Sequence, residues 1–240
     1  MLNIKDKNAL ITGSANRIGR EIAIYLSKIG VNIAIHYNKS EAKAMETLSE
    51  VKKSKVNSRI FKADLSVESE TLALYDKVTE ELGPISILIN NASTFRKNNL
   101  ESTTSEEILE DYFVNVISPF LLSQKIHKNK KINSGKIINI SDWKTARENR
   151  FSYGASKSAI AGLTKSLAVS MAPNFQVNEI AFGAMLPPAD EPNRIPQKIN
   201  LGPMGRTAQM SEINSCINML LQNDFITGEK IYLDGGRHIY

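Results

Sequence analysis

The sequence contains a single cysteine, Cys216, and no apolar run that approaches the length of a membrane-spanning helix. One cysteine cannot form an internal disulfide bond, and a transmembrane helix needs roughly 18 consecutive apolar residues. Residues 1–7 also lack the apolar stretch of a secretory signal. These absences argue against a disulfide-stabilised secreted fold and against a membrane partner, and we expect a cytoplasmic protein.

The sequence also lacks any concentration of charge. The net charge is +5, and the lysines that produce it are spread along the chain. A nucleic-acid surface would need a basic stripe with interleaved aromatic residues, which is not there, and an anionic small molecule explains the charge as well. The chain has 240 residues with 42% hydrophobic content, no internal repeat and no linker-like segment. We therefore predict one domain over residues 1–240, with a small-molecule partner and no nucleic acid.

Short apolar runs alternate with amphipathic stretches along the whole chain. This alternation is typical of an α/β fold in which helices cover both faces of a parallel sheet. The expected strands are 8–12, 31–36, 59–62, 85–90, 136–141, 175–181 and 229–233. The expected helices are 17–29, one capped by Ser40, 67–82, one opened by the capping box Thr104-x-x-Glu107, 153–171 and 211–221. The pattern predicts a single-domain, doubly wound parallel sheet.

Tyr153 and Lys157 are four residues apart on an expected helix, so they stand on one face, one turn from each other. A free phenol ionises near pH ~10, and an ammonium group within a few ångströms favours the phenolate and allows proton exchange near neutrality. Taken alone, the pair is equally compatible with a half-buried tyrosine beside a solvated lysine.

Other polar residues gather where ligands bind in such sheets, beyond the carboxyl ends of the strands. The turn 12–19 follows the first strand and leads into a helix N-terminus, whose free N–H groups suit a pyrophosphate. The end of the second strand, residues 36–40, has no carboxylate before Glu41. Lys39 offers charge and Ser40 a hydroxyl for a 2′-phosphate, which favours NADPH over NADH.

Together these motifs resemble the short-chain dehydrogenase/reductase family over essentially the whole chain. They are the turn 12–19, Asp64, Asn90-Asn-Ala92, Asn115, Tyr153-x3-Lys157 and Asp234-Gly-Gly. The resemblance implies a Rossmann-like fold in which Tyr153 exchanges the reaction's proton, Lys157 holds the nicotinamide ribose and lowers the pKa of the tyrosine, and Asn115 supports a water relay. It also implies cofactor contacts, with Asp64 near the adenine, from Gly13, Arg17, Ile18, Gly19, His36, Tyr37, Lys39, Ser40, Asp64, Leu65, Asn91, Ala92, Tyr153, Lys157 and Gly183. No metal site is predicted.

Within that family, four positions are similar to the pterin reductases: Arg17, Ser93, Phe95 and Asp142. With Tyr153, the resemblance implies that they bind a flat pterin stacked on Phe95 against the nicotinamide, and physics favours such stacking. The ending 234–238, preceded by 226–228, is similar to that of bacterial dihydromonapterin reductases. We therefore expect NADPH-dependent reduction of dihydromonapterin or dihydrofolate. The alternatives are a general reductase of 3-oxoacyl or sugar ketones and a dinucleotide-binding protein without turnover.

Two features keep details open. Most family members place a catalytic serine after the fifth strand, and because strand residues alternate faces, only one of Ser141 and Asp142 points at the substrate. We favour Asp142, although the segment 143–152 looks about two residues shorter than usual in the family.

The resemblance also implies a homotetramer in which Arg237 or His238 reaches a neighbour's site, the alternative being an ordinary exposed tail. The loop 185–196 is expected to cover the substrate.

Overall fold

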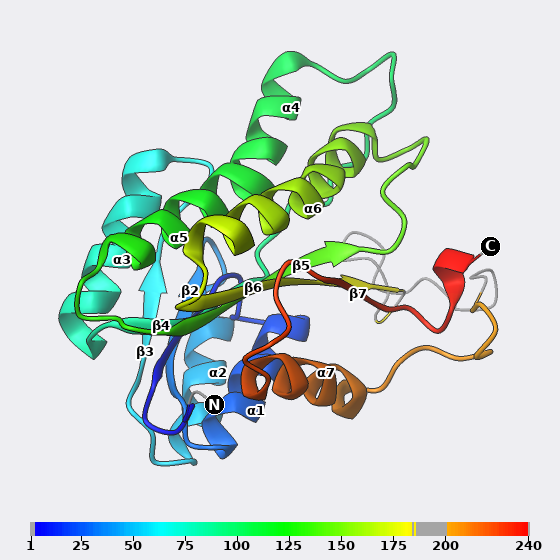
Figure 1. Ribbon diagram of the computed structural model, residues 1–240. Coiled ribbons are helices and arrows are strands. Elements are labelled where there is room, and N and C mark those ends of the chain that lie inside the picture. The colour runs from blue at the N-terminus through cyan, green and yellow to red at the C-terminus, as the bar shows by residue number, and fades with distance from the viewer. Residues whose placement is uncertain (1–2, 184, 186–200, 240) are drawn as a thin grey trace.

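The apolar runs form the strands of one seven-stranded sheet, with the order β3-β2-β1-β4-β5-β6-β7 and parallel pairing throughout (Figure 1). This computed structural model describes residues 3–183, 185 and 201–239. The strands are β1 (Asn8–Ile11), β2 (Asn32–Tyr37), β3 (Ser58–Lys62), β4 (Ile85–Asn90), β5 (Gly135–Asp142), β6 (Phe175–Phe182) and β7 (Lys230–Leu233). Because the order reverses between β1 and β4, a crevice for a ligand is expected there.

Helices cover both faces of the sheet, as the sequence predicts. They are α1 (Arg17–Lys28), α2 (Glu41–Lys52), α3 (Glu68–Leu82), α4 (Ser105–Tyr112), α5 (Ser118–Lys128), α6 (Phe151–Met171) and α7 (Met210–Gln222). Alternate strand residues enter opposite cores: Ile11 packs with α1, α2 and α7, whereas Leu10 packs with α3, α5 and α6. The predicted doubly wound α/β fold is therefore confirmed. Among the described helices, none is long and apolar enough to cross a bilayer.

The sequence predicts one long helix that begins at the capping box of Thr104 and runs past Phe120, and the structure departs from this. The predicted capping box is present. The Thr104 side chain accepts the Glu107 N–H at 3.2 Å, and the Glu107 carboxylate accepts the Thr104 N–H. Between α4 and α5, however, Phe113–Ile117 forms a π-helical segment. Such segments reorient side chains and often occur at functional sites. This one carries Asn115, at the face of α6 that holds Tyr153 and Lys157.

Candidate functional site

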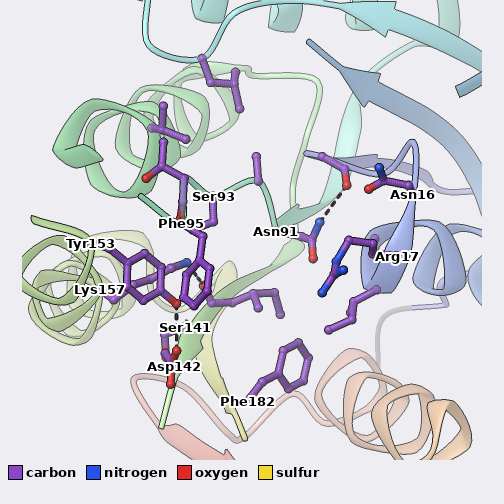
Figure 2. Close-up of a pocket in the computed structure, with 18 of the residues that line it drawn as sticks. Asn16, Arg17, Asn91, Ser93, Phe95, Ser141, Asp142, Tyr153, Lys157 and Phe182 are labelled. Carbon is purple, nitrogen blue, oxygen red and sulfur yellow. Dashed lines mark hydrogen bonds between the residues drawn. The ribbon is translucent and has the colours of Figure 1, made fainter. Parts of the chain in front are cut away.

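A cavity of about 770 Å³ opens at the carboxyl ends of the strands (Figure 2). One end is built from the turn after β1 and the ends of β2 and β3, and the other from the segments after β4 and β5 together with α6. Its lining includes these predicted residues: Gly13, Arg17, Ile18, Gly19, His36, Lys39, Asp64, Leu65, Asn91, Ala92, Ser93, Phe95, Asp142, Tyr153, Lys157 and Gly183. The structure thus brings most of the predicted site together.

The turn after β1 packs so tightly against the end of β4 that only glycine fits. A Cβ on Gly13 would lie 2.9 Å from Ala92 Cα, and one on Gly19 would lie 2.5 Å from both Asn91 Nδ2 and Gly13 O. Asn91 Nδ2 fixes the turn by donating to Thr12 O at 2.9 Å and Gly13 O at 3.0 Å. Beyond it, α1 begins at Arg17, and the side chain of its N-cap, Asn16, does not cap the helix. The cradle is narrow and presents helix N–H groups, which suits a pyrophosphate.

His36, at the end of β2, is hydrogen-bonded to this turn. The Gly13 N–H donates to His36 Nδ1 at 2.9 Å, so the ring proton must be on Nε2, which faces Ala63 O at 3.0 Å. Burial lowers the pKa of His36 to about 4, which keeps the ring neutral. The predicted cofactor residue His36 therefore has a structural task, holding the ends of β1 and β3 in register.

Two predicted cofactor residues do not line the cavity. The Tyr37 ring is buried in the core beneath α1 and α2, because it follows His36 and points to the opposite face of β2. Ser40 occupies the predicted N-cap position of α2, but its side chain makes no capping bond. The neighbouring Asn38, which the sequence analysis did not single out, lines the cavity beside Lys39. Position in the strand, more than residue type, decides which of these side chains reaches the cavity.

Asp64 lines the cavity at the end of β3. Its Oδ1 accepts the Ser66 N–H at 2.9 Å and the Ser66 hydroxyl at 2.7 Å, and these bonds lower the pKa of Asp64. The carboxylate therefore holds its own turn in shape, while Asp64 and Leu65 still face the cavity. Asp64 does not cap α3, whose N-cap is Val67, and its contact with adenine stays a prediction.

Tyr153 and Lys157 lie on one face of α6, but their electrostatics differ from the expectation. Tyr153 Oη donates to Asp142 Oδ2 at 2.9 Å, and burial, followed by the charge of Asp142, raises the pKa of Tyr153 well above 10. The positive charges that oppose this rise belong to Arg147 and Arg150. Lys157 Nζ donates to Ile140 O at 2.9 Å, and burial lowers its pKa to about 8. The predicted lowering of the tyrosine pKa by Lys157 is thus wrong for this arrangement, because burial and Asp142 dominate.

Asn115 lies behind this pair, in the π-helical segment. Its Nδ2 donates to Ser156 Oγ at 2.9 Å and to Thr94 Oγ1 at 3.3 Å. Its Oδ1 is buried and has no hydrogen-bond partner among the described residues. A buried acceptor left open in this way suits a bound water, which is what a relay behind Lys157 requires.

Ser141 and Asp142 point to opposite sides of β5, as strand alternation demands. Ser141 Oγ donates to Glu179 Oε1, a fully buried carboxylate on β6 that also pairs with Lys230 Nζ at 3.2 Å. Asp142 faces the Tyr153 hydroxyl instead (Figure 2). Of the two candidates left open by the sequence, Asp142 is the one whose side chain meets the tyrosine.

Phe95 stands beside the tyrosine at the same end of the cavity (Figure 2). Its ring contacts the Tyr153 ring edge to face, with the centroids 4.8 Å apart. The Arg150 guanidinium lies 3.7 Å from the Phe95 ring centroid, and Arg150 Nη1 also donates to Phe95 O. Because Arg150 covers one face, at most the opposite face is left for a planar guest. Arg150 could not be predicted from the sequence, since nothing in its spacing relates it to a residue 55 positions earlier.

The C-terminal residues are engaged within their own chain. Arg237 lines the same cavity, and its guanidinium lies 4.7 Å from the Trp143 ring centroid. His238 Nδ1 lies 2.9 Å from Asp234 Oδ2, and its ring stacks on Tyr232. Within the chain, Arg237 thus reaches the cavity and His238 is paired with Asp234, and the expectation that one of them reaches a neighbour's site stays a prediction. Within the predicted loop 185–196, only Met185 is described, and it lines the cavity.

Within the described part of the chain, no group of three or more His, Cys, Asp or Glu side chains could hold a metal ion. The end of the cavity next to α6 presents the Tyr153 phenol, the Asp142 carboxylate, the Lys157 amine and the Arg147 guanidinium.

The chain is similar to known proteins over nearly its whole length. The family model described as enoyl-(acyl carrier protein) reductase, of the short-chain dehydrogenase type, matches residues 13–238. The 3-oxoacyl-(acyl-carrier-protein) reductase FabG of Staphylococcus aureus is 31% identical over 97% of this chain and 98% of its own length. The 2-dehydro-3-deoxy-D-gluconate 5-dehydrogenase of Formosa agariphila is 29% identical over 98% of this chain and 94% of its own.

Among solved structures, the FolM alternative dihydrofolate reductase 1 of Brucella canis, complexed with NADP, is similar with a TM-score of 0.90. It is 30% identical, and the match covers 99% of this chain and 96% of that one. The relatives thus share a scaffold but differ in the substrates that their names describe.

Proposed function

The chain belongs to the short-chain dehydrogenase/reductase family, and from this premise we propose that it is an NADPH-dependent reductase of dihydropterins such as dihydromonapterin or dihydrofolate. The observation that carries the substrate is the cluster of Phe95, Tyr153 and Asp142. It combines an aromatic ring, a buried phenol and a carboxylate, while Ser141 is turned toward Glu179. A planar nitrogen heterocycle would stack on Phe95 and hydrogen-bond to Tyr153, which Asp142 holds in place.

The dinucleotide crevice fits NADPH in three respects. The turn after β1 packs closely on Asn91 and Ala92 because Gly13 and Gly19 have no Cβ, and the N-terminus of α1 that follows it suits a pyrophosphate. Lys39 and Asn38 line the end of β2 without a carboxylate that would bind ribose hydroxyls and repel a 2′-phosphate. The NADP bound to the Brucella relative supports the same choice.

The catalytic end supplies the remaining groups. Bound NADPH would provide a hydride for the C=N carbon of the dihydropterin. Tyr153 holds the proton that the adjacent ring nitrogen needs, since its raised pKa keeps the phenol protonated. Lys157, which lines the cavity and donates to Ile140 O, would hold the nicotinamide ribose, and Asn115 Oδ1 would accept a hydrogen bond from a relay water.

Substrate assays test this proposal directly. Purified protein would be mixed with NADPH and with dihydromonapterin, dihydrofolate, a 3-oxoacyl thioester or a sugar ketone, and loss of the reduced-nicotinamide absorbance followed. We expect the dihydropterins to be reduced fastest. NADPH oxidation with neither dihydropterin would reject the substrate, and NADPH binding without oxidation of any compound would favour a non-catalytic dinucleotide-binding protein.

A second candidate is a general ketone reductase, which the similarity to the Staphylococcus and Formosa enzymes favours. Ser141 also borders the cavity, but its hydroxyl donates to the buried Glu179, so a role for Ser141 in binding a ketone would require that bond to break. Homotetrameric assembly and a cytoplasmic location stay predictions. Light scattering on the purified protein would test the first.

A further inference from the structure

An ion pair joins the turn after β5 to the catalytic end of the cavity. Arg147 Nη2 donates to Asp142 Oδ1 at 2.7 Å and to Asp142 Oδ2 at 2.8 Å. The guanidinium is itself fixed, because Arg147 Nε donates to Lys144 O at 2.8 Å. The two side chains are only 28% and 13% exposed, so solvent screens the pair incompletely. We call this ion pair between Arg147 and Asp142 the clamp; it lies in the turn between β5 and α6.

The clamp completes the hydrogen bonding of Asp142. Oδ1 also accepts the Lys144 N–H at 2.9 Å, and Oδ2 also accepts the Tyr153 hydroxyl at 2.9 Å. An ionised carboxylate has about four acceptor sites, and here all are used. A proton on either oxygen would face a donor and break at least one of these bonds. In this arrangement Asp142 acts as an acceptor.

We propose that Arg147 is a positioning residue: it aims Asp142 Oδ2 at the Tyr153 hydroxyl and so leaves Tyr153, instead of Asp142, as the donor of the reaction's proton. The hydrogen bonds that join Arg147, Asp142 and Tyr153 do not depend on the substrate, whereas the role of Tyr153 as proton donor rests on the proposed function. In that reaction the C=N carbon gains the hydride of NADPH. The Tyr153 O–H bond breaks as an N–H bond forms at the adjacent ring nitrogen, and the phenolate regains a proton from water.

The orientation of the Asp142 carboxylate depends on Arg147, because its other hydrogen bonds would allow it to rotate. Lys144 N–H holds only Oδ1, and the Tyr153 hydroxyl can rotate about its own C–O bond. Removing Arg147 also removes a positive charge that lowers the pKa of Tyr153. Loss of the clamp should therefore disturb the orientation of the phenol and its acidity together.

The first test needs no substrate. Crystal structures would be determined for Arg147→Gln and for Arg59→Gln, a matched control that removes an exposed ion pair with Glu81 at the far side of the sheet. We expect the Asp142 to Tyr153 contact to lengthen beyond about 3.5 Å in Arg147→Gln, which is too long for a hydrogen bond, and to stay near 2.9 Å in the control. An unchanged contact in Arg147→Gln would overturn the proposal.

The second test is a double-mutant cycle in steady-state turnover. Arg147→Gln should lower kcat with a dihydropterin by about tenfold or more and leave the KM for NADPH within about twofold, but should add less than about twofold in an Asp142→Asn background. Arg147→Lys, which keeps the charge but loses the bond to Lys144 O, should fall between. Equal losses in both backgrounds would contradict an action through Asp142. If the wild type reduces no dihydropterin, the proposed function is wrong. The crystal structures would still show whether Arg147 positions Asp142.

Discussion

The two ends of the cavity are built on different physical principles. At the dinucleotide end, the turn after β1 is held by backbone contacts, by two glycines and by a neutral, buried His36. At the catalytic end, charged side chains converge on one phenol within a short segment, and Arg147 and Arg150 partly compensate Asp142. The first end should therefore be sensitive to added atoms and to protonation, and the second to the loss of a single proton or charge.

The largest effect is expected at the catalytic end. Tyr153→Phe removes only the hydroxyl, so turnover should fall by about 10²- to 10⁴-fold while the dissociation constant of NADPH changes little. Turnover and NADPH fluorescence titration would measure the two. Tyr25→Phe on α1 is the matched control and should retain activity. Unchanged turnover in Tyr153→Phe would remove the tyrosine from the mechanism.

At the dinucleotide end, pH should act through His36. Its pKa falls from 6.5 to about 4 on folding, so the unfolded chain binds a proton first as the pH is lowered. The stability contributed by the neutral ring is present above pH 6.5 and is lost progressively between pH 6.5 and about 4. The loss amounts to roughly 3 kcal/mol of unfolding free energy. His36→Gln should be less stable at neutral pH but lose less stability over this range in urea titrations; parallel pH profiles would contradict the assignment.

Added atoms should damage the same end. A Cβ at Gly19 would lie 2.5 Å from Gly13 O and from Asn91 Nδ2, so Gly19→Ala must push the turn away from β4. We expect a loss of about 1–3 kcal/mol in stability and weaker NADPH binding. Gly162→Ala on α6 is the control, because a Cβ there meets nothing within 4 Å in the described chain, and it should stabilise the helix by up to about 1 kcal/mol. Equal behaviour of the two variants, in thermal melts and NADPH titrations, would break the contrast.

The smallest expected effect concerns the choice of cofactor. Lys39 is exposed at the end of β2, where its charge meets solvent as well as a ligand. Lys39→Ala should raise the dissociation constant of NADPH about tenfold and that of NADH less than about twofold. The exposed Lys43→Ala on α2 is a control for lost charge. Equal losses for both nucleotides would mean that the 2′-phosphate lies elsewhere.

Sequence periodicity predicted the fold well, because a parallel sheet requires continuous apolar strands and the capping box marks where α4 begins. It also located most cavity residues, since strand ends in this topology meet at one edge. It did not predict the π-helical segment, because its residues fit the periodicity of an ordinary helix. It placed Tyr37 in the site by motif, although strand alternation turns the ring into the core.

The charged partners of the catalytic end were beyond sequence reasoning for a different reason. Arg147 and Arg150 act through the geometry of the turn between β5 and α6, and no repeat or spacing rule specifies which carboxylate or ring each guanidinium meets. The same holds for Ser141, whose orientation follows from strand alternation but whose partner Glu179 comes from the neighbouring strand. Side-chain pairing across loops is decided by tertiary packing.

The central claim is that a flat heterocycle lies between Phe95 and the nicotinamide, within hydrogen-bond reach of Tyr153. A crystal structure of the protein with NADP⁺ and a dihydropterin tests it most directly. We predict a pterin ring stacked on the face of Phe95 opposite Arg150, with a ring nitrogen about 3 Å from Tyr153 Oη. A pterin bound elsewhere, or a Phe95 ring turned away from the nicotinamide, would contradict the account.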